Sequence, residues 1–452
     1  MAAQRVALAF LGIAVTAVAS VACTSHPRSY SLTRAELEDP QTCMSCHPSA
    51  YQQWSGSMHA YASEDPVFLA MNARGQRETG GALGSFCVKC HAPLALQEGL
   101  TVDGTNLPSL EPKFRGVNCY FCHTIDEVTG DHNAAVHTAE DMTMRGGITN
   151  PLYNGVHRAK YDALDDRNTL DSSNACGSCH DVVTGHGARI ERTFAEWRAT
   201  VFDTAGALRQ TCGNCHMPGS DGPAAEFPGA PVRRVHDHSM PGIDLALTPF
   251  AETSAQTLAV KTFLSNQLYN RLCVVPAGAE TDITVRLDNA FAGHDFPSGA
   301  AQDRRLWLEL RAWSGTSEVF STGVVPDGTD VTTLADPNLW LFRDQMLDTA
   351  GAPTHMFWEA ASVMTNLMPS VTTLDQSNPA YYHYREKTFQ VFAQPVTKIT
   401  MRARVIPVGL DVIDDLINSG DLDPSYRGKI PTLDLESTGQ TWTPASPVCT
   451  VQ

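Results

Sequence analysis

The C-terminal half of the chain alternates between apolar and polar residues with a period of two. This alternation runs over residues 283–288, 306–311 and 399–405. Successive side chains of a β-strand point to opposite faces, so the period predicts strands with one buried face. Several such strands, separated by Gly, Pro and Asp turns, predict an antiparallel β-sandwich domain over residues 248–452.

Helical spacing is confined to short stretches. Phe194, Trp197 and Val201 recur every three or four residues, which predicts a helix that packs against a core. A further helix is expected between residue 248 and Gln267, and a short one over residues 412–417.

The first residues have the pattern of an export signal. Arg5 precedes an apolar run over residues 6–19, and small residues follow up to Cys23. The run is too short to be trusted as a membrane span. We therefore expect a signal peptide over residues 1–22 and a polar tether over residues 23–42, in a protein exported to the periplasm, outer membrane or cell surface of a bacterium.

Residues 43–247 contain few long apolar runs and carry the pattern Cys-x-x-Cys-His five times. Two thiols at this spacing reach the two vinyl groups of one haem as thioethers, and the adjacent imidazole becomes the proximal iron ligand. One motif alone also fits a redox CxxC or half of a zinc site, but neither alternative requires histidine after every CxxC. We predict five covalent haem c groups in a mainly α-helical and irregular domain, with the porphyrins as its core. The motifs are Cys43/Cys46/His47, Cys87/Cys90/His91, Cys119/Cys122/His123, Cys176/Cys179/His180 and Cys212/Cys215/His216.

Net charge narrows the class of partner. The chain carries a formal charge of −17, which disfavours nucleic acid and suits cationic redox proteins. Acidity is also a common means of staying soluble, and a homo-oligomer remains open.

The cysteines outside the motifs indicate two modifications. Of thirteen cysteines, the five motifs use ten, leaving Cys23, Cys273 and Cys449. Cys273 and Cys449 bracket the C-terminal domain and are expected to form a disulfide in an oxidising compartment. Cys23 stands where a bacterial lipoprotein is cut and acylated, although Ser20 replaces the usual leucine. The alternative is cleavage after Ala22, which leaves a free thiol.

The distal iron positions determine function, because a second histidine favours electron transfer and an open position permits substrate chemistry. Sixteen histidines exceed the ten that five irons with two imidazoles each would use. His59 is expected to bind a different haem from His47, since a continuous helix would separate the two by about 18 Å. A surface position for His59 and a structural turn at His294 are the alternatives. His137 is a further candidate, His186 ranks lower, and His355 and His383 are expected to be structural. The expected distal ligands are His59, His157, His238, His236, His132 and His294.

Several motifs resemble the multihaem cytochromes of the cytochrome c-554 type. The resemblance includes the first motif with Tyr51, Trp54, Ser57 and His59, and the residues around the third, fourth and fifth motifs. It extends through His238-Ser-Met-Pro-Gly and, for β-domains fused to such cytochromes, Ala292-Gly-His-Asp-Phe-Pro-Ser-Gly. The cytochrome that gives this family its name is a tetrahaem carrier that accepts electrons from hydroxylamine oxidoreductase. The resemblance implies distal-ligand roles for His59, His157 and His238. This chain departs from it by having five motifs and a β-domain.

The sequence therefore predicts an electron carrier with mostly bis-histidine haems, linking redox partners of the cell envelope. One alternative is an oxidoreductase that acts on a nitrogen or sulfur oxyanion at one five-coordinate haem. No motif has the lysine of pentahaem nitrite reductases in place of histidine, which argues against that activity. The other alternative is a subunit of an extracellular cytochrome filament.

Overall fold

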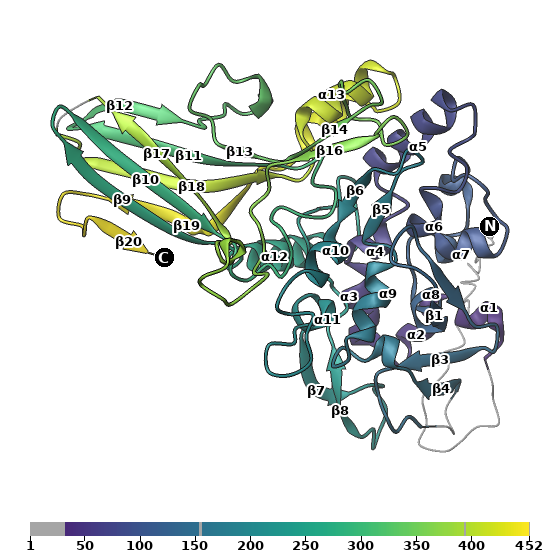
Figure 1. The fold of residues 1–452 in the computed structure, drawn as a ribbon. Helices are drawn as coiled ribbons and strands as arrows, with labels where there is room; N and C mark the ends of the chain where they lie inside the picture. The colour runs from purple at the N-terminus through teal and green to yellow at the C-terminus, as the bar shows by residue number, and fades with distance from the viewer. Residues whose placement is uncertain (1–31, 153–155, 393–394, 452) are drawn as a thin grey trace, which may run out of the picture.

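The computed structural model describes residues 32–152, 156–392 and 395–451. They form two parts that lie against each other: a helix-rich part that carries the five motifs, and a part dominated by two large antiparallel sheets (Figure 1). Within the described ranges, no helix has both the length and the apolar character that crossing a bilayer demands. The expected signal peptide and Cys23 lie outside the described residues.

Short helices joined by loops build the first part. Proline at the first helical position and an aspartate cap begin two of them: Asp39 accepts from the Gln41 amide at 2.9 Å and Asp65 from the Val67 amide at 2.7 Å. The helices are α1 (Arg34–Leu37), α2 (Pro40–Met44), α3 (Pro48–Ser55), α4 (Met58–Tyr61), α5 (Pro66–Glu78), α6 (Val88–His91), α7 (Pro93–Gln97), α8 (Cys119–Thr124), α9 (Asp171–Gly177), α10 (Thr193–Arg198) and α11 (Cys212–His216).

Four two-stranded ribbons connect these helices. Three are antiparallel, and the pair β3 and β4 is parallel. The ribbons are β1 (Ile125–Val128) with β2 (Val136–Thr138), β3 (Thr143–Gly146) with β4 (Arg158–Tyr161), β5 (Asp181–Val183) with β6 (Arg189–Arg192), and β7 (Gly219–Pro223) with β8 (Val232–His236).

Part of the segment expected to be a tether is folded. Leu32 and Leu37 are 7% and 3% exposed and pack against Leu94 and Tyr120. The two leucines stand singly among polar residues, so no apolar pattern indicated their burial. The expectation of a free tether up to residue 42 is therefore corrected from Leu32 onward.

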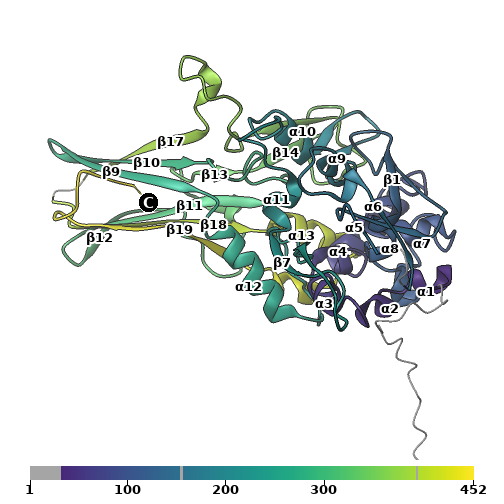
Figure 2. The ribbon, with the colours of Figure 1, turned by 90° about the horizontal axis from the view of Figure 1, so that it is seen from below.

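Two antiparallel sheets dominate the second part, and Figure 2 shows them edge-on as two layers. The first has the order β17-β10-β9-β20 and the second β12-β11-β18-β19, with β13 beside β11. Helix α12 (Thr253–Leu264) precedes them, and β14 to β16 form a small third sheet. Helix α13 (Leu410–Asn418) includes residues 412–417, where a helix was expected. The strands are β9 (Tyr269–Ala277), β10 (Glu280–Asp288), β11 (Arg305–Ser314), β12 (Ser317–Thr322), β13 (Leu341–Phe342), β14 (Asp344–Leu347), β15 (Pro353–Thr354), β16 (Ser362–Thr365), β17 (Tyr384–Val391), β18 (Lys398–Ile406), β19 (Leu433–Trp442) and β20 (Cys449–Val451).

One apolar core lies between the two large sheets. Ile283, Val285 and Leu287 of β10 are fully buried and share this core with alternate residues of β18. Strand β11 differs, because its first six residues are all buried. Trp307, on its second face, is covered by Val331 and Ile406, so β11 is buried on both faces although its sequence alternates.

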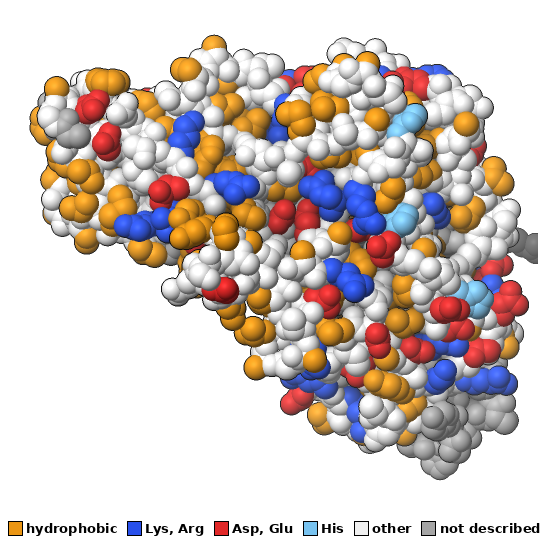
Figure 3. Space-filling view, viewed as in Figure 1, with side chains coloured by type: hydrophobic (Ala, Val, Ile, Leu, Met, Phe, Trp, Pro, Cys, Tyr) orange, Lys and Arg blue, Asp and Glu red, His pale blue; other side chains and the backbone are white. Residues whose placement is uncertain are grey.

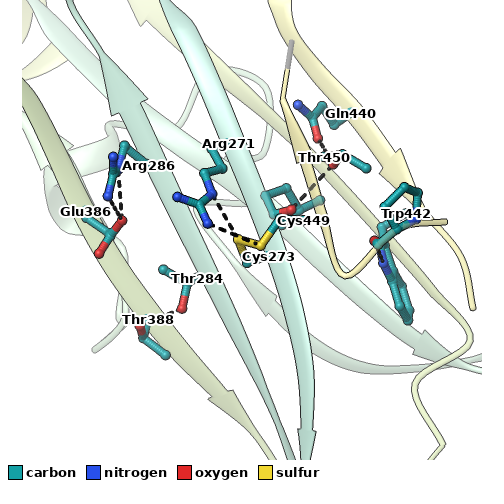
Figure 4. Close-up of a disulfide and its surroundings, with 12 residues drawn as sticks. Arg271, Cys273, Thr284, Arg286, Glu386, Thr388, Gln440, Trp442, Cys449 and Thr450 are labelled. Atoms are coloured by element: carbon teal, nitrogen blue, oxygen red, sulfur yellow. Dashed lines mark hydrogen bonds and ion pairs between the residues drawn. A yellow bond between two sulfur atoms is a disulfide. The ribbon is translucent and has the colours of Figure 1, made fainter.

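A disulfide joins the last strand to the first sheet (Figure 4). Cys449 of β20 lies opposite Cys273 of β9 in the antiparallel register. The bond links cysteines 176 residues apart, so it encloses almost the whole C-terminal part, in agreement with the pairing expected from the sequence.

The second part also packs directly on the helix-rich part. Val412, Ile413 and Leu416 of α13 share an apolar cluster with Ala70 and Met71 of α5. At the edge of this cluster, Arg74 pairs with Asp415 at 3.0 Å. The side of the helix-rich part formed by α5 is therefore covered by residues from the end of the chain.

A buried ion pair lies at this junction. The Arg305 guanidinium is fully buried and donates to Asp411 at 2.6 Å, while Arg343 and His355 lie 3.3 and 3.5 Å from the same carboxylate. Burial opposes ionisation, but the hydrogen bond from His355 and the charge of Arg305 outweigh it and hold the pKa of Asp411 well below its usual range.

We expect Asp411→Ala to lower the free energy of unfolding by about 3–5 kcal/mol, because the variant leaves Arg305 buried without its counter-charge. A folded-state pKa below the unfolded value means that the native pair stabilises above about pH 4 and is lost as pH falls. Urea unfolding between pH 2 and 8 measures both effects. Asp414→Ala is the matched control on α13: its half-exposed pair with Arg427 predicts a loss below about 1 kcal/mol. Equal losses in the two variants would contradict the prediction.

Candidate haem-binding site

All five motifs line one cavity inside the helix-rich part. Its volume is about 2050 Å³, and the two cysteines and the histidine of every motif contribute to its wall. Apolar side chains, including Phe68, Met71, Phe194 and Trp197, complete the lining. A space of this size walled by thiols, imidazoles and apolar groups has the chemistry that covalently attached porphyrins require.

The local sequence folds each motif into a tight turn of helix. Asn118 caps α8 by accepting from the Phe121 amide at 3.0 Å, and Thr211 with Asn214 forms a capping box on α11. Gly177 follows Cys176 directly, and a Cβ atom there would meet the Phe194 ring at 2.2 Å. Glycine therefore permits α10 to pack tightly against the fourth motif.

Backbone carbonyl groups orient the proximal imidazoles. The Nδ1 atoms of His47, His91, His123 and His216 lie 2.6, 2.9, 2.7 and 2.9 Å from the carbonyl oxygens of Ala224, Ala62, Arg145 and Pro241. A carbonyl oxygen only accepts, so each Nδ1 carries the hydrogen and each Nε2 is left with a free lone pair. This arrangement is typical of histidines that bind metal through Nε2.

Four of the five proximal rings face a second histidine ring. A metal–nitrogen bond of about 2 Å on each side, plus about 1 Å from nitrogen to ring centre, requires a separation of about 6 Å between two axial imidazoles. The four observed separations agree with this value. The ring centroids lie 6.2 Å apart for His47 and His157, 6.0 Å for His180 and His59, 6.4 Å for His123 and His238, and 6.5 Å for His216 and His294.

The distal rings are held in the same way as the proximal ones. The Nδ1 atoms of His157, His238 and His294 lie 2.8–2.9 Å from backbone carbonyl oxygens, whereas the buried Nδ1 of His59 has no partner in the described residues. Burial lowers the pKa of His59 to about 3 and that of His238 to about 4. These imidazoles are therefore neutral at physiological pH, the form that coordinates iron.

The second motif is different. The ring of His91 stacks on Phe68 at 4.0 Å with an interplanar angle of 6°, and no other histidine ring in the described part of the chain is paired with it. Phe68 supplies no lone pair. The residues in place thus provide two axial imidazoles at four motifs and only one, His91, at the second motif.

Two expected distal ligands lie away from every proximal ring in the described residues. His132 is 39% exposed and its Nδ1 bonds to Asp131 at 2.6 Å, while His236 of β8 lines the cavity without a ring partner. Their roles as ligands remain predictions without support from this geometry. His137, His355 and His383 each pair with carboxylates, and His186 is exposed.

Nine of the motif cysteines are free thiols here, standing for thioether sulfurs, and they bring the motifs into one array. Thiols of different motifs lie close enough to change each other's pKa, and Cys122 adds a longer-range influence on the fourth motif. A contact with Cys119 lowers the pKa of Cys43, and contacts with Cys179 and Cys212 raise those of Cys90 and Cys176. The first motif therefore adjoins the third, and the fourth adjoins the second, third and fifth.

Some charged side chains on the cavity wall were not singled out from the sequence. Arg167 lines the cavity beside the fifth motif and donates to the Met217 carbonyl oxygen at 2.8 Å. Glu191, Asp303 and Arg304 line it as well. No local pattern marks these residues, because chain folding alone brings them to the motifs.

Comparisons with known proteins found one family model and one solved structure that resemble this chain. Residues 42–124 match the family model described as cytochrome c554 and c-prime. The fold is similar to the crystal structure of a penta-haem cytochrome c552 from Thermochromatium tepidum, with a TM-score of 0.63 and 19% identity. That similarity covers 90% of this chain and 99% of the other. No curated protein matches.

Proposed function

We propose that this chain, which its family match and fold support as a multihaem c-type cytochrome, carries electrons along five covalently bound haems between redox partners of the cell envelope. One observation carries the proposal: four proximal imidazoles each face a second imidazole at 6.0–6.5 Å. Two strong axial ligands leave no iron position for substrate, which suits outer-sphere electron transfer.

The chain's own residues perform three tasks in this function. A haem bound between two such rings supplies an iron that alternates between the ferric and ferrous states. The backbone carbonyl groups that accept from Nδ1 fix the orientation of the imidazoles in both states. The site therefore rearranges little when an electron is transferred. The apolar lining around Phe194 and Trp197 limits the access of water. The contacts between cysteines place neighbouring motifs side by side.

The same contacts suggest a branched route for the electron. The first motif is linked through the third to the fourth, and the second and fifth motifs each join the fourth. We infer that the fourth haem is the branch point. Electrons entering at the first haem would leave through either the second or the fifth.

Counting the irons by spin state tests the proposal. We expect electron paramagnetic resonance of the oxidised protein to show four low-spin ferric irons and one high-spin iron, the latter held by His91. Carbon monoxide should bind one ferrous iron per chain. The haem content, measured on the same sample by pyridine haemochromogen, is the control. Two or more high-spin irons in a fully loaded sample would contradict the proposal.

A second candidate function is favoured by the missing ring partner of His91. An open iron position at the haem held by His91 permits a small ligand to bind, so reduction of a nitrogen or sulfur oxyanion at this haem is the alternative. Turnover of nitrite, hydroxylamine or sulfite with a chemical reductant tests it. Rates at the level of free haem would leave electron transfer as the function.

The cellular setting is also proposed. We infer export from the N-terminal pattern and attachment to a membrane through acylated Cys23, which mass spectrometry of the mature protein tests. Cationic redox proteins fit the net charge of −17. On the face in Figure 3, acidic and basic side chains are interspersed, so on this face the charge is not gathered into one acidic field.

A further inference from the structure

Glu191 is a carboxyl group on the cavity wall that has no partner in the described residues. Glu191 belongs to β6, between the buried Ile190 and Arg192, which pairs with Asp344 at 2.8 Å. The Glu191 side chain lines the cavity, and in the described residues it forms no hydrogen bond or ion pair. A carboxylate that lines an apolar cavity normally acquires a partner, so the lack of one here points to a functional role.

The cation that most affects the Glu191 pKa does not neutralise the carboxylate. Arg304 gives its two Nη atoms to Asp244 at 2.9 and 3.0 Å and its Nε atom to the Ser298 carbonyl oxygen at 2.8 Å. Asp303, whose Oδ1 is buried without a partner, adds a further negative group. The wall around Glu191 therefore holds more carboxylates than free cations.

These surroundings place the titration of Glu191 near neutrality. Burial raises the pKa of Glu191 to about 7, with Asp303, Asp244 and Asp181 adding to the increase and Arg304 opposing it. Asp181 itself is paired with Arg189 at 3.0 Å. The charge of Glu191 is in turn felt at the Cys90 sulfur, one of the two attachment points of the second motif.

We propose that Glu191 takes up a proton from solvent when the haem attached to Cys87 and Cys90 is reduced. One electron from a reduced redox partner converts the ferric iron to ferrous, and one proton converts the Glu191 carboxylate to the carboxylic acid. The extra negative charge brought by the electron is thereby compensated within the cavity wall. This inference rests on the proposed function, and it adds proton uptake to electron transfer at the one haem that lacks a second imidazole.

The sign of the pH effect follows from linkage. The ferric haem carries one positive charge more than the ferrous haem, so Glu191 is more acidic in the oxidised protein. Between the two pKa values, reduction binds a proton, and the midpoint potential falls as pH rises. Full coupling changes the reduction equilibrium tenfold per pH unit, which is about 59 mV for one electron. Outside this interval the potential is constant.

The experiment is a redox titration of the holoprotein at several pH values, followed through the high-spin signal assigned to the His91 haem. We expect a negative slope around neutrality in the native protein. Glu191→Gln should remove the slope and raise the potential at alkaline pH, since the carboxylate no longer stabilises the ferric iron. Glu196→Gln is the matched control: Glu196 is buried nearby and also titrates high, with a pKa of about 8, but it accepts from Ser298 at 2.6 Å and does not line the cavity. A slope that survives Glu191→Gln, or that disappears in Glu196→Gln, would overturn the proposal.

Infrared difference spectroscopy keeps the test valid if Glu191→Gln does not fold. In the native protein we expect reduction to produce the band of a protonated carboxyl group, shifted in deuterium oxide. Absence of that band overturns the proposal. The band does not depend on the spin state of the iron. A missing high-spin signal would therefore refute the open position at His91, and the infrared band alone would decide whether Glu191 takes up a proton.

Discussion

Replacing His59 with alanine is expected to convert one of four low-spin ferric irons into a high-spin iron while all five haems remain attached. The His59 ring lies 6.0 Å from that of His180, and burial keeps it neutral, so it supplies the second imidazole of the fourth haem. Alanine cannot ligate iron. Because the fourth haem is the proposed branch point, electron exchange among the haems should also slow.

Electron paramagnetic resonance and intact-protein mass spectrometry together check this prediction. The low-spin signal should fall by about a quarter, as expected for one of four paired irons, with an unchanged mass of bound haem. His132→Ala is the control, since His132 is exposed and pairs with Asp131. An unaltered spin count in His59→Ala would show that another group completes the fourth haem.

Removing the disulfide is expected to lower the free energy of unfolding of the C-terminal part by about 5 kcal/mol. The bond joins cysteines 176 residues apart, and the chain-entropy model assigns this stabilisation to the lost freedom of so long a loop in the unfolded chain. Cys273→Ser with Cys449→Ser should therefore unfold at lower denaturant concentration.

Guanidinium unfolding of oxidised native protein and of the double variant measures the difference. Native protein treated with a reductant is the matched control, because it lacks the bond but keeps both cysteines, and it should behave like the variant. A loss below about 1 kcal/mol in both would show that the strand register of β9 and β20 holds without the bond.

The features that could be predicted from the sequence are those that depend on a local pattern of residues. Five motifs fixed the positions of ten sulfurs and five imidazoles, and alternation located β10 and β18. The expected ligands included His157, His238 and His294. The proximal histidine that each of them faces was not predicted, because each pair joins residues far apart in the chain. His132 was expected to be a ligand on similar local grounds, but its side chain lies on the surface. Only folding separates these cases.

Features formed by packing between distant segments escaped prediction. Glu191 gains its environment from Arg304 and Asp303, more than a hundred residues later. The burial of Trp307 on the second face of β11 comes from Val331, which lies in a short 3-10 helix, and from Ile406. The missing partner of His91 could not be read from a chain with more histidines than ligand positions.

If Cys23 is acylated, the buried leucines Leu32 and Leu37 would limit the distance between the folded protein and a bilayer. Cys23 precedes Leu32 by nine residues, and a fully extended stretch of that length spans at most about 30 Å. If Cys23 bears lipid, this short segment keeps the flank near Tyr120 close to the headgroups. Such confinement favours electron exchange with membrane-embedded donors at the third motif and leaves the opposite flank free to meet diffusing acceptors.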